Sequence, residues 1–481
     1  MGSQEDHSVH VAIIGAGIAG ITLGIGLLER NIPFRIYERA PGFREIGAGI
    51  GFSPNSERAM GSLSPAMLSA FKRVANPNGE DYFQWMFGHA GGGGGSSINP
   101  SSFDHDKLLY KLYVGKDGFQ GSRRSDILEE WSKQIPPDLI SFGKELESIT
   151  DDSGAGDSPV EMRFRDGTIA RADLVIGCDG IRSRVRQHVL SPPDSSTTTS
   201  SSNDASLPLP KSVNPHYSGK FCFRDLAPMS SAVAAIGEYK SSRRFMYNGP
   251  GAHVITYPVA GNKFLNVLVV ISDPGGVEGW PAELVAQGRH TVRGLTKQEA
   301  VDAFRGWNKT VRGIVDLLPD ELEKWAIFDM AEHPAETYVK GRVALAGDAA
   351  HATGPHLGAG GGLGIEDALC LAGLIQAVPG QIAQRSKGEG EGGIGSALAE
   401  EKEIKEKLVE RALKIYNDVR YERTQWVVQA TREAVDLFQW KDGSGQDPAE
   451  FAKEITEKFH KVWDYDLDDM VERAVKELEK A

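Results

Sequence analysis

Two glycine-rich segments that lie far apart in the chain place the strongest constraint on its fold. The first reads Gly-Ala-Gly-Ile-Ala-Gly over residues 15–20 and directly follows the apolar run 9–14. The second contains Leu-Ala-Gly-Asp-Ala-Ala-His at 345–351 and Gly-Ala-Gly-Gly-Gly-Leu-Gly at 358–364. A short apolar run that ends in glycines is typical of a buried strand that turns into a helix. Together the segments indicate an α/β domain that holds one extended ligand at both of its ends.

The first segment has the residue types that a Rossmann-like dinucleotide-binding turn requires. Gly15 makes the turn, Gly17 lets the backbone approach a pyrophosphate, and Gly20 lets helix and strand pack closely. The N–H groups and the dipole of the following helix then bind phosphate. Glu38 ends the next predicted strand, where its carboxylate can accept hydrogen bonds from an adenosine ribose. The alternative is a glycine-rich packing turn, and the strand, the helix and the acidic residue together disfavour it.

The second segment distinguishes between the two dinucleotides, NAD and FAD. Asp348 follows a predicted strand, at a place where a carboxylate can accept hydrogen bonds from the ribityl hydroxyls of a flavin. The glycines at 358–364 open a helix whose N–H groups can face the flavin edge, which becomes anionic at N1 and C2=O on reduction. A plain helix N-cap is the other role open to Asp348. The two segments together therefore predict one bound FAD.

Composition excludes several classes of partner. The net charge of −13, without any cluster of Lys or Arg, disfavours nucleic acid. Three widely spaced cysteines, Cys178, Cys222 and Cys370, show no spacing of a disulfide framework or metal site, so a reducing, cytoplasmic location is expected. The run 11–28 is as apolar as a membrane-spanning segment, but its glycines fit a strand–turn–helix unit. No membrane partner is therefore expected. At 481 residues the chain has room for two or three domains.

The order of predicted elements divides the chain into four parts. Residues 1–190 and 331–380 are predicted to be the first and second parts of an FAD-binding domain. Between them, 211–330 is predicted to be an inserted substrate-binding sheet, because apolar and alternating runs follow one another from 217 to 272. Charged helical sequence predicts a helical C-terminal region over 398–481. The expected fold class is thus α/β with an added antiparallel β domain. Three Gly-, Ser- or Pro-rich stretches are expected to be loops: 89–102, 191–210 and 388–395.

Three motifs give the chain a resemblance to the FAD-dependent aromatic hydroxylases, the single-component flavoprotein monooxygenases that include salicylate hydroxylase. They are the glycine motif at 15–20, the Asp-Gly motif in Gly-Cys-Asp-Gly-Ile-Arg-Ser at 177–183, and Gly-Asp at 347–348. Their order and distances match the family over nearly the whole chain. Within the family, four segments are similar to fungal enzymes that hydroxylate and dearomatise resorcinol-type polyketides, such as the tropolone-pathway monooxygenase: 42–49, 180–188, 220–224 and 253–258.

The resemblance implies a reaction and its participants. NADPH or NADH reduces FAD, oxygen adds to the flavin C4a position to give a hydroperoxide, and an electron-rich ring carbon attacks its distal oxygen. Water must be excluded from the active site until that attack has taken place. The sequence shows no separate nicotinamide-binding domain, so NAD(P)H is expected to bind transiently at the segment around Asp179. Three reactions remain open: salicylate hydroxylation with loss of carbon dioxide, simple ring hydroxylation, and dearomatising hydroxylation of a polyketide.

The resemblance also implies three catalytic residues. In the fungal relatives an arginine and a tyrosine hold the substrate phenolate, and the matching residues are Arg224 and Tyr257. A guanidinium beside the phenolic oxygen lowers its pKa and fixes which ring carbon faces the flavin. The alternatives are a salt bridge for Arg224 and packing within a strand for Tyr257. His356 is predicted to line the pocket, the alternative being that it only orders its loop, and His356-Leu357 stands where the relative has two adjacent histidines. His351 is expected to brace its turn rather than to react.

Residues of these motifs and of the elements around them make up the predicted cofactor-binding set. They are Gly15, Gly17, Gly20, Glu38, Arg39, Gly49, Arg124, Asp179, Asp348, Gly358, Ala359, Gly360 and Gly361. Within this set, Arg124 at a predicted helix start resembles the family arginine that reaches the flavin or its phosphates. Arg44 is a further candidate beside the flavin or the nicotinamide, and no metal site is predicted.

The leading hypothesis is therefore an FAD- and NAD(P)H-dependent monooxygenase that acts on a small phenolic substrate with molecular oxygen, as a monomer or a homodimer. Two rival functions use the same fold. One is a flavin oxidase or dehydrogenase that transfers no oxygen to its substrate. The other is a non-catalytic flavoprotein that binds partners.

Overall fold

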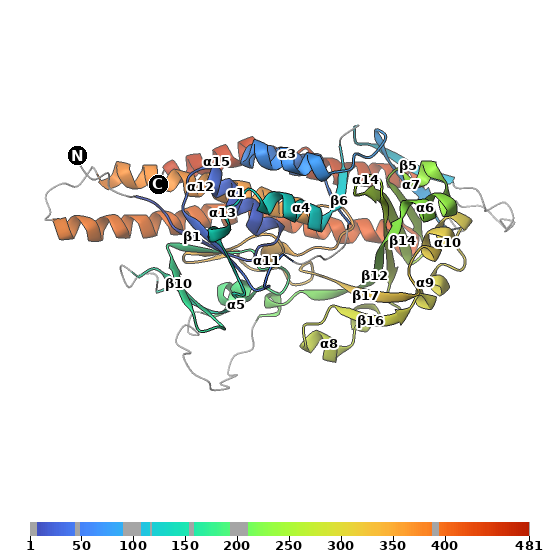
Figure 1. Cartoon of the computed structure of the whole chain (residues 1–481), viewed down its shortest axis with the longest axis horizontal. Coiled ribbons are helices and arrows are strands. Elements are labelled where there is room, and N and C mark those ends of the chain that lie inside the picture. The colour runs from blue at the N-terminus through green and yellow to red at the C-terminus, as the bar shows by residue number, and fades with distance from the viewer. Residues whose placement is uncertain are drawn as a thin grey trace.

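Two sheets, joined by long C-terminal helices, make up most of the fold (Figure 1). The computed structural model describes residues 7–43, 49–89, 107–115, 118–152, 158–192, 210–386 and 394–480. The predicted loops at 89–102, 191–210 and 388–395 lie largely outside these residues, and so does Arg44.

The first sheet is mostly parallel and belongs to the predicted FAD-binding domain. Its six strands follow the order β18 (Val339–Lys340), β19 (Val343–Leu345), β11 (Leu174–Gly177), β1 (Val11–Ile14), β2 (Phe34–Glu38) and β7 (Ile140–Phe142). The strand β1 pairs in parallel with β2 and β11, and β11 pairs in parallel with β19. Parallel neighbours end at the same edge of a sheet, so the segments after β1, β11 and β19 meet there. The prediction of one α/β domain built from distant parts of the chain is confirmed.

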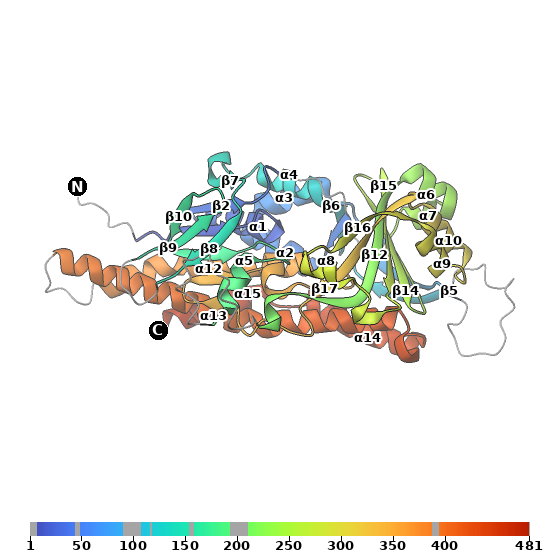
Figure 2. The same cartoon turned by 90° about the horizontal axis from the view of Figure 1, so that it is seen from below.

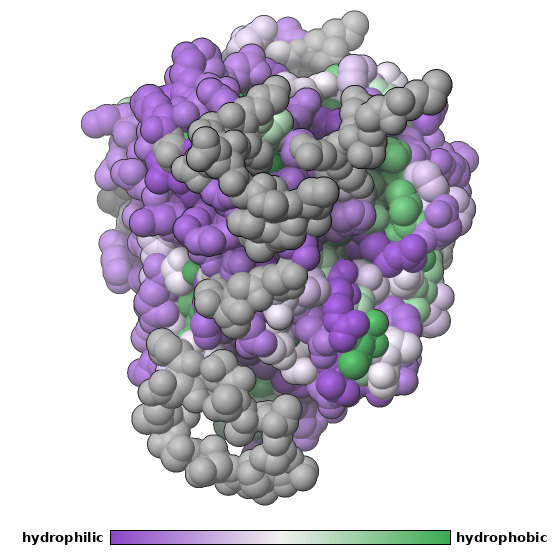
Figure 3. Space-filling view, turned by 90° about the vertical axis from the view of Figure 1, so that its left-hand side faces the viewer, coloured by the Kyte–Doolittle hydropathy of each residue, from purple (hydrophilic) through white to green (hydrophobic). Residues whose placement is uncertain are grey.

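Helices α1 (Ile18–Glu29) and α12 (Gly360–Ser386) follow the two glycine segments and pack against each other. By length and hydropathy the stretch Gly360–Arg385 could cross a membrane, but 83% of its most apolar window is buried inside the protein. The helix therefore has the surroundings of a core helix. The face of the molecule seen in Figure 3 is largely hydrophilic, with only small apolar areas.

The second sheet has eight strands and is mostly antiparallel. Their order is β16 (Thr291–Thr296), β17 (Glu321–Asp329), β12 (His216–Pro228), β15 (Phe264–Ser272), β14 (Ala252–Val259), β13 (Phe245–Gly249), β4 (Tyr82–Phe87) and β5 (Lys107–Tyr113). The sheet extends beyond the segment 211–330, because β4 pairs in parallel with β13 at its edge. One face is covered by helices α6 (Met229–Ile236), α7 (Glu238–Ser241), α9 (Gln298–Ala303) and α10 (Lys309–Asp316) (Figure 2). The other face is directed toward the first sheet and the C-terminal helices.

Three C-terminal helices hold the two sheets together: α13 (Ile394–Phe438), α14 (Pro448–Trp463) and α15 (Leu467–Glu479). The helix α13 runs along the long axis and contacts β18 of the first sheet and β13 of the second (Figures 1 and 2). Aromatic side chains of α14 pack on the second sheet, where Phe451 and Phe459 contact the ring of Trp85 on β4. The predicted helical C-terminal region thus packs against both sheets.

Three segments have local structures that depend on long-range contacts. The apolar run 169–176 is two strands, because β10 (Ile169–Ala172) pairs with β9 (Val160–Phe164) whereas β11 joins the first sheet. Asp173 separates them, and its carboxylate accepts a hydrogen bond from the backbone N–H of His10. The glycine-rich segment 43–54 contains β3 (Gly49–Phe52), which pairs with β6 (Gln120–Arg123). The segment 297–318 contains α9 and α10, and Asn308 caps the second.

The remaining described elements are shorter or lie beside those above. They are α2 (Pro54–Leu63), α3 (Pro65–Val74), α4 (Arg124–Ser132), β8 (Leu146–Thr150), α5 (Arg184–Leu190), α8 (Ala282–Ala286) and α11 (Asp348–His351).

Candidate active site

The two glycine segments predicted to bind one cofactor are in direct contact. A Cβ atom added to Gly347 would lie 3.0 Å from the Cβ of Ala19, and one added to Gly364 would lie 3.1 Å from it. Ala19 belongs to the first glycine segment, so side chains larger than glycine at either position would push the segments apart. The segments therefore form one continuous surface at the carboxyl edge of the first sheet, where open α/β sheets bind ligands.

Two of the three glycines in the first segment are required by packing. Gly15 has φ of +102°, and a Cβ there would lie 2.5 Å from the carbonyl oxygen of Cys178. A Cβ on Gly20 would lie 1.9 Å from the carbonyl oxygen of Gly15. At Gly17, in contrast, the nearest atom to an added Cβ is a guanidinium nitrogen of Arg124 at 3.8 Å. The space over Gly17, at the N-terminus of α1 and under an arginine, fits a phosphate group.

Glu38 holds the same turn from the end of β2. Its Oε2 accepts a hydrogen bond from the N–H of Ala16 at 2.8 Å, and its Oε1 accepts one from the N–H of Ala40 at 2.8 Å. A carboxylate has about four acceptor sites, so the predicted ribose contact remains available. Arg39 is exposed at this edge. Burial and then the charge of Arg39 lower the pKa of Arg182, so two guanidinium groups lie near each other there.

The Asp179 side chain is directed toward the N-terminus of α5. Its carboxylate accepts hydrogen bonds from the Ser183 hydroxyl at 2.5 Å and from the backbone N–H of Arg184 at 2.7 Å, which caps α5. Burial raises the pKa of Asp179, and these hydrogen bonds oppose that shift. The Cα of Asp179 lies 3.0 Å from the position of a Cβ on Gly15. The Asp-Gly segment thus packs on the dinucleotide turn through its backbone.

Arg186 was missed from the sequence and connects the Asp-Gly segment to the second glycine segment. Its Nη1 donates hydrogen bonds to the carbonyl oxygens of Asp348 and Ala349, and its Nε donates one to that of Val213. The side chain is buried. The sequence feature that could have identified Arg186 is its position on the apolar face of a short predicted helix. A charged side chain there needs buried hydrogen-bond acceptors.

Asp348 lies at the start of α11, beyond the carboxyl end of β19 in the first sheet. Its side chain keeps contact with solvent while the neighbouring alanines are buried. The protein nevertheless surrounds it closely enough that desolvation raises its pKa, and the charges of His351, Arg124 and Arg186 oppose that shift. A carboxylate with free acceptor sites inside a recess fits the hydroxyl groups of a flavin side chain.

Arg124, at the start of α4, connects the cofactor segments to the second sheet. Burial lowers its pKa. Among the charges that act on it, those of Asp348 and Glu38 raise its pKa, and that of Arg224 lowers it. Arg124 is therefore within electrostatic reach of both predicted ends of the cofactor site and of the predicted substrate residue. The charges of Asp348, Glu38 and Arg224 thus all act on Arg124.

A buried ion network fixes the turn that carries Asp348. The Oδ2 atom of Asp367 accepts hydrogen bonds from the N–H of Gly347 at 2.9 Å and from His351 Nε2 at 2.6 Å, and its Oδ1 accepts one from Arg420 Nε at 2.8 Å. Burial would raise the pKa of Asp367, but the charges of His351 and Arg420 and the hydrogen bonds lower it to about 2. Neighbouring Glu366 pairs with Arg420 at 2.8 Å. His351 thus braces the turn, in line with its expected structural role.

The glycines that open α12 face β3 and Phe119. A Cβ on Gly358 would lie 3.2 Å from the Phe119 ring, and one on Gly361 would lie 3.2 Å from the ring of Phe52 on β3. Gly358, Gly360 and Gly361 are half-buried, whereas Ala359 is buried. These glycines leave the backbone at the start of α12 accessible from the recess.

Gly49 brings β3 against the second sheet. Its N–H donates a hydrogen bond to Asn266 Oδ1 at 3.1 Å, and a Cβ on it would lie 2.9 Å from the Tyr257 hydroxyl oxygen. The predicted flavin residues and the predicted substrate residues therefore meet at Gly49. Asn266, on β15, was not predicted.

Arg224 and Tyr257 lie on the face of the second sheet that is directed toward the recess. The Arg224 guanidinium stacks on the Trp325 ring at 3.7 Å, and no carboxylate among the described residues forms an ion pair with it. Burial lowers the pKa of Arg224. Burial raises the pKa of Tyr257 to about 12, against the opposing charges of Arg244 and Arg224. The salt-bridge alternative for Arg224 finds no support in these contacts.

His356 follows α11 and packs beside β14 at a different place from Tyr257. Its ring is 5.4 Å from that of His253, which is on β14 four residues before Tyr257. Four residues of strand span ~13 Å. His253 accepts a hydrogen bond at Nδ1 from Gln439. Along β14, His356 is therefore nearer to His253 than to Tyr257, whereas the register places Arg224 level with Ile255, two residues from His253.

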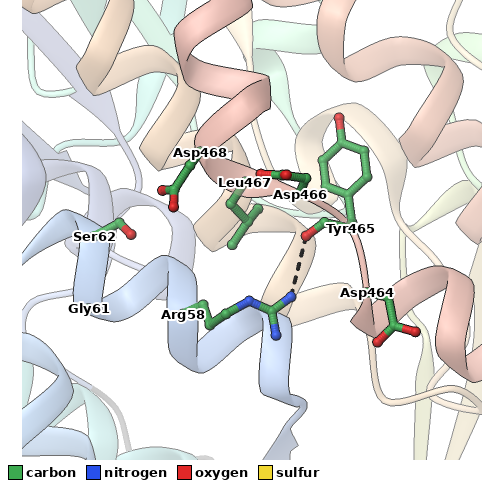
Figure 4. Close-up of a pocket in the computed structure, with 8 residues that line it drawn as sticks. All are labelled: Arg58, Gly61, Ser62, Asp464, Tyr465, Asp466, Leu467 and Asp468. Atoms are coloured by element: carbon green, nitrogen blue, oxygen red, sulfur yellow. Dashed lines mark hydrogen bonds between the residues drawn. The ribbon is translucent and has the colours of Figure 1, made fainter.

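An open cavity lies elsewhere on the surface of the protein. It has a volume of about 620 Å³ and lies between α2 and the turn from α14 to α15 (Figure 4). Arg58 points across it and donates hydrogen bonds to the backbone carbonyls of Trp463 and Tyr465. None of the predicted site residues lines this cavity, so it has no part in the site described here.

The family of the chain follows from its match to known proteins. The model of the FAD binding domain family matches residues 8–254 and 259–387. The chain belongs to this family. It is 42% identical over 479 residues to FAD-dependent monooxygenase pigN of Monascus ruber, covering 99% of this chain and 98% of that protein. It is also 42% identical to dual trans-enoyl reductase/FAD-dependent monooxygenase tazHJ of Aspergillus terreus, where the match covers 97% of this chain and 60% of the longer protein.

A solved structure supports the same assignment. The structure named "Salicylate hydroxylase substrate complex" superposes with a TM-score of 0.75 at 26% identity, over 98% of this chain and 99% of that one. The protein is an FAD-dependent monooxygenase of the salicylate hydroxylase-like type, and the predictions of its class and of FAD as cofactor are confirmed.

Replacing Asp348 with Ala in this flavoprotein is expected to weaken FAD binding by about 1–3 kcal/mol, because a desolvated charged acceptor is lost. Titration of the apoprotein with FAD, followed by flavin fluorescence, measures the change. Asp468→Ala removes an exposed carboxylate at the surface cavity and should bind FAD like the wild type. Equal affinities of Asp348→Ala and wild type would place Asp348 outside the flavin site.

Replacing Asp367 with Asn is expected to lower the free energy of unfolding by about 3–5 kcal/mol, because Arg420 and His351 lose a buried partner. Chemical unfolding measures the loss, and FAD affinity should fall with it because the Gly347 turn loosens. The control Glu403→Gln removes an exposed ion pair with Lys407 and should change little. A variant as stable as the wild type would show that the network does not fix the turn.

Proposed function

We propose that this enzyme hydroxylates a phenolic aromatic ring with molecular oxygen, using FAD that NADPH or NADH reduces. One observation carries the proposal. A half-buried arginine on the second sheet, Arg224, has no carboxylate partner among the described residues and lies within electrostatic reach of Arg124, on which the charges of Asp348 and Glu38 also act. The cofactor segments and an unpaired cation thus face the same recess, as a site for an anionic ring beside a flavin requires.

The residues of the first sheet fit FAD along its whole length. The open space over Gly17 and the guanidinium of Arg124 would hold the pyrophosphate, Glu38 the adenosine ribose, and Asp348 the flavin side chain. The backbone at the start of α12, near Gly358, would face the flavin ring. Bound there, FAD would supply the electrons and the activated oxygen for the reaction.

Arg224 and Tyr257 would prepare the substrate. A guanidinium next to a phenolic oxygen favours the phenolate, which makes the ring carbons electron-rich. Tyr257, whose pKa burial raises to about 12, keeps its proton at neutral pH and can donate a hydrogen bond to the same oxygen. Because both side chains project from one sheet face, they would fix the ring in a single orientation toward the flavin.

The packing around these residues would keep water from the reacting atoms. The second sheet is covered on its outer face by α6, α9 and α10, and its inner face packs on α13 and α14. We propose a salicylate-like or resorcinol-type polyketide substrate, in fungal secondary metabolism. The relatives pigN and tazHJ are fungal FAD-dependent monooxygenases, and the solved relative is a salicylate hydroxylase with substrate.

The proposal is tested by mixing the FAD-loaded enzyme with NADPH or NADH and a series of phenols, including salicylate and resorcinol aldehydes. We expect one or more phenols to stimulate NAD(P)H consumption and to yield a product that carries one added oxygen atom. Mass spectrometry after reaction under ¹⁸O₂ measures that atom. Stoichiometric hydrogen peroxide together with a substrate that is only oxidised would identify a flavin oxidase instead.

Arg224→Ala is expected to keep its FAD but to hydroxylate about ten- to a hundred-fold more slowly at neutral pH. The loss of a charge-assisted contact of about 1.5–3 kcal/mol gives this range. The phenol then keeps its solution pKa, so the rate of the variant should rise with pH as solvent deprotonates the substrate. Tyr257→Phe removes one neutral donor and should lose less. Rates across pH measure both variants, and wild-type activity of Arg224→Ala at neutral pH would refute the role of Arg224.

A further inference from the structure

A second arginine, Arg244, is buried in the second sheet without a charged partner. It lies directly before β13, and only 5% of its surface is exposed. Its Nε and Nη1 atoms form no hydrogen bond with any of the described residues. Burial lowers its pKa to about 9, so the side chain still carries a positive charge at neutral pH. An unpaired cation in this position is costly, because a buried charge normally has an acidic partner.

Aromatic rings surround the guanidinium group. Its Cζ lies 3.3 Å from the centroid of the Phe119 ring and 4.0 Å from that of Phe83, and the Tyr257 ring is at 5.9 Å. Cation–π contacts of this kind recover part of the desolvation cost but leave the N–H donors at the guanidinium edge unused. Planar aromatic walls with free donors at the edge are the features of a site for a planar anion.

The position of Arg244 connects it to the active site. Phe119, on which it stacks, also contacts the Gly358 backbone at the start of α12 and β3 at Gly51. Tyr257 is within electrostatic reach of both Arg244 and Arg224. Tyr257 therefore lies between two buried guanidinium groups, neither of which has an acidic partner among the residues described.

We propose that Arg244 binds a second acidic oxygen substituent of the aromatic substrate, while Arg224 and Tyr257 hold the first. This inference rests on the proposed function and specifies its substrate class: a ring with two acidic oxygen groups, either two hydroxyls or a hydroxyl and a carboxylate. The planar guanidinium can donate two parallel hydrogen bonds to such a group. A second point of binding would reinforce the ring orientation that Arg224 and Tyr257 set.

The decisive variant is Arg244→Met, which keeps an extended apolar side chain between Phe83 and Phe119 and removes the charge. The matched control is Arg243→Met, because Arg243 is the next residue in the chain but stacks on Tyr239 near the surface and pairs with Glu80. Both variants are first loaded with FAD, and their flavin content and thermal unfolding are compared with those of the wild type.

Dissociation constants are then measured from the change in flavin absorbance for phenol, resorcinol and salicylate, without NAD(P)H. We expect Arg244→Met to bind resorcinol, salicylate or both at least tenfold more weakly than the wild type, with phenol changed less than twofold. The ligand that is affected distinguishes a hydroxyl from a carboxylate. Arg243→Met should bind all three ligands like the wild type, and Arg244→Lys should recover part of the lost affinity.

Two results would overturn the inference. One is unchanged binding of resorcinol and salicylate by Arg244→Met, and the other is an equal loss for all three ligands, which would mark a structural role. The proposed function can fail separately, because it requires an oxygenated product with NAD(P)H present. If the wild type hydroxylates none of the phenols but Arg244→Met selectively loses binding, the anion site at Arg244 is supported. The proposed monooxygenase reaction on phenols is then refuted.

Discussion

The buried charges of Glu366 and Asp367 hold the parts of the protein in their relative places. Asp367 accepts hydrogen bonds from the Gly347 backbone and His351 and pairs with Arg420, and Glu366 pairs with Arg420 and Arg423. Both acids are on α12 and both arginines are on α13, which contacts both sheets. Since a buried ion pair is tolerated only when every charge is matched, the arrangement specifies one alignment of α12 against α13. That alignment sets where Asp348 lies.

The active-site recess follows from this alignment. The second sheet contacts the separate β3–β6 pair at Gly49, whose N–H donates a hydrogen bond to Asn266. Charges of residues from both large sheets act on Arg124. Neither sheet alone contains a complete site. The first provides a surface for an extended dinucleotide, and the second provides buried cations. In the proposed site, the reaction would therefore depend on the distance between the sheets, which the packing of α12 against α13 helps to fix.

The parts of the fold that local patterns determine could be predicted from the sequence. The strand–turn–helix units at 9–29 and 343–386 follow from glycine spacing and apolar runs, and the structure contains both. Long-range pairing could not be predicted in the same way. The pairing of β4 with β13, the break at Asp173 and the use of 49–52 as a strand depend on neighbours that the local sequence does not contain.

The same distinction applies to the site. Motif residues such as Gly15, Glu38 and Asp348 were predicted because each stands at a fixed place beside a strand. Arg186 and Arg244 were not, because an arginine in an apolar segment has no pattern that separates a buried side chain from an exposed one. Only the fold shows that Arg186 reaches three carbonyl oxygens whereas Arg244 has unused donors.

Three arginines of the proposed site differ in charge from the protein as a whole. The chain carries a net charge of −13, yet Arg124, Arg224 and Arg244 are largely removed from solvent and form no ion pair with the described carboxylates. Positive groups in a low-dielectric recess act over longer distances than they would on the surface. They attract anionic ligands into a site whose surroundings repel them. In the proposed site, these arginines extend from the phosphate-binding turn to the second sheet, where they would contact the dinucleotide and the phenolate in turn.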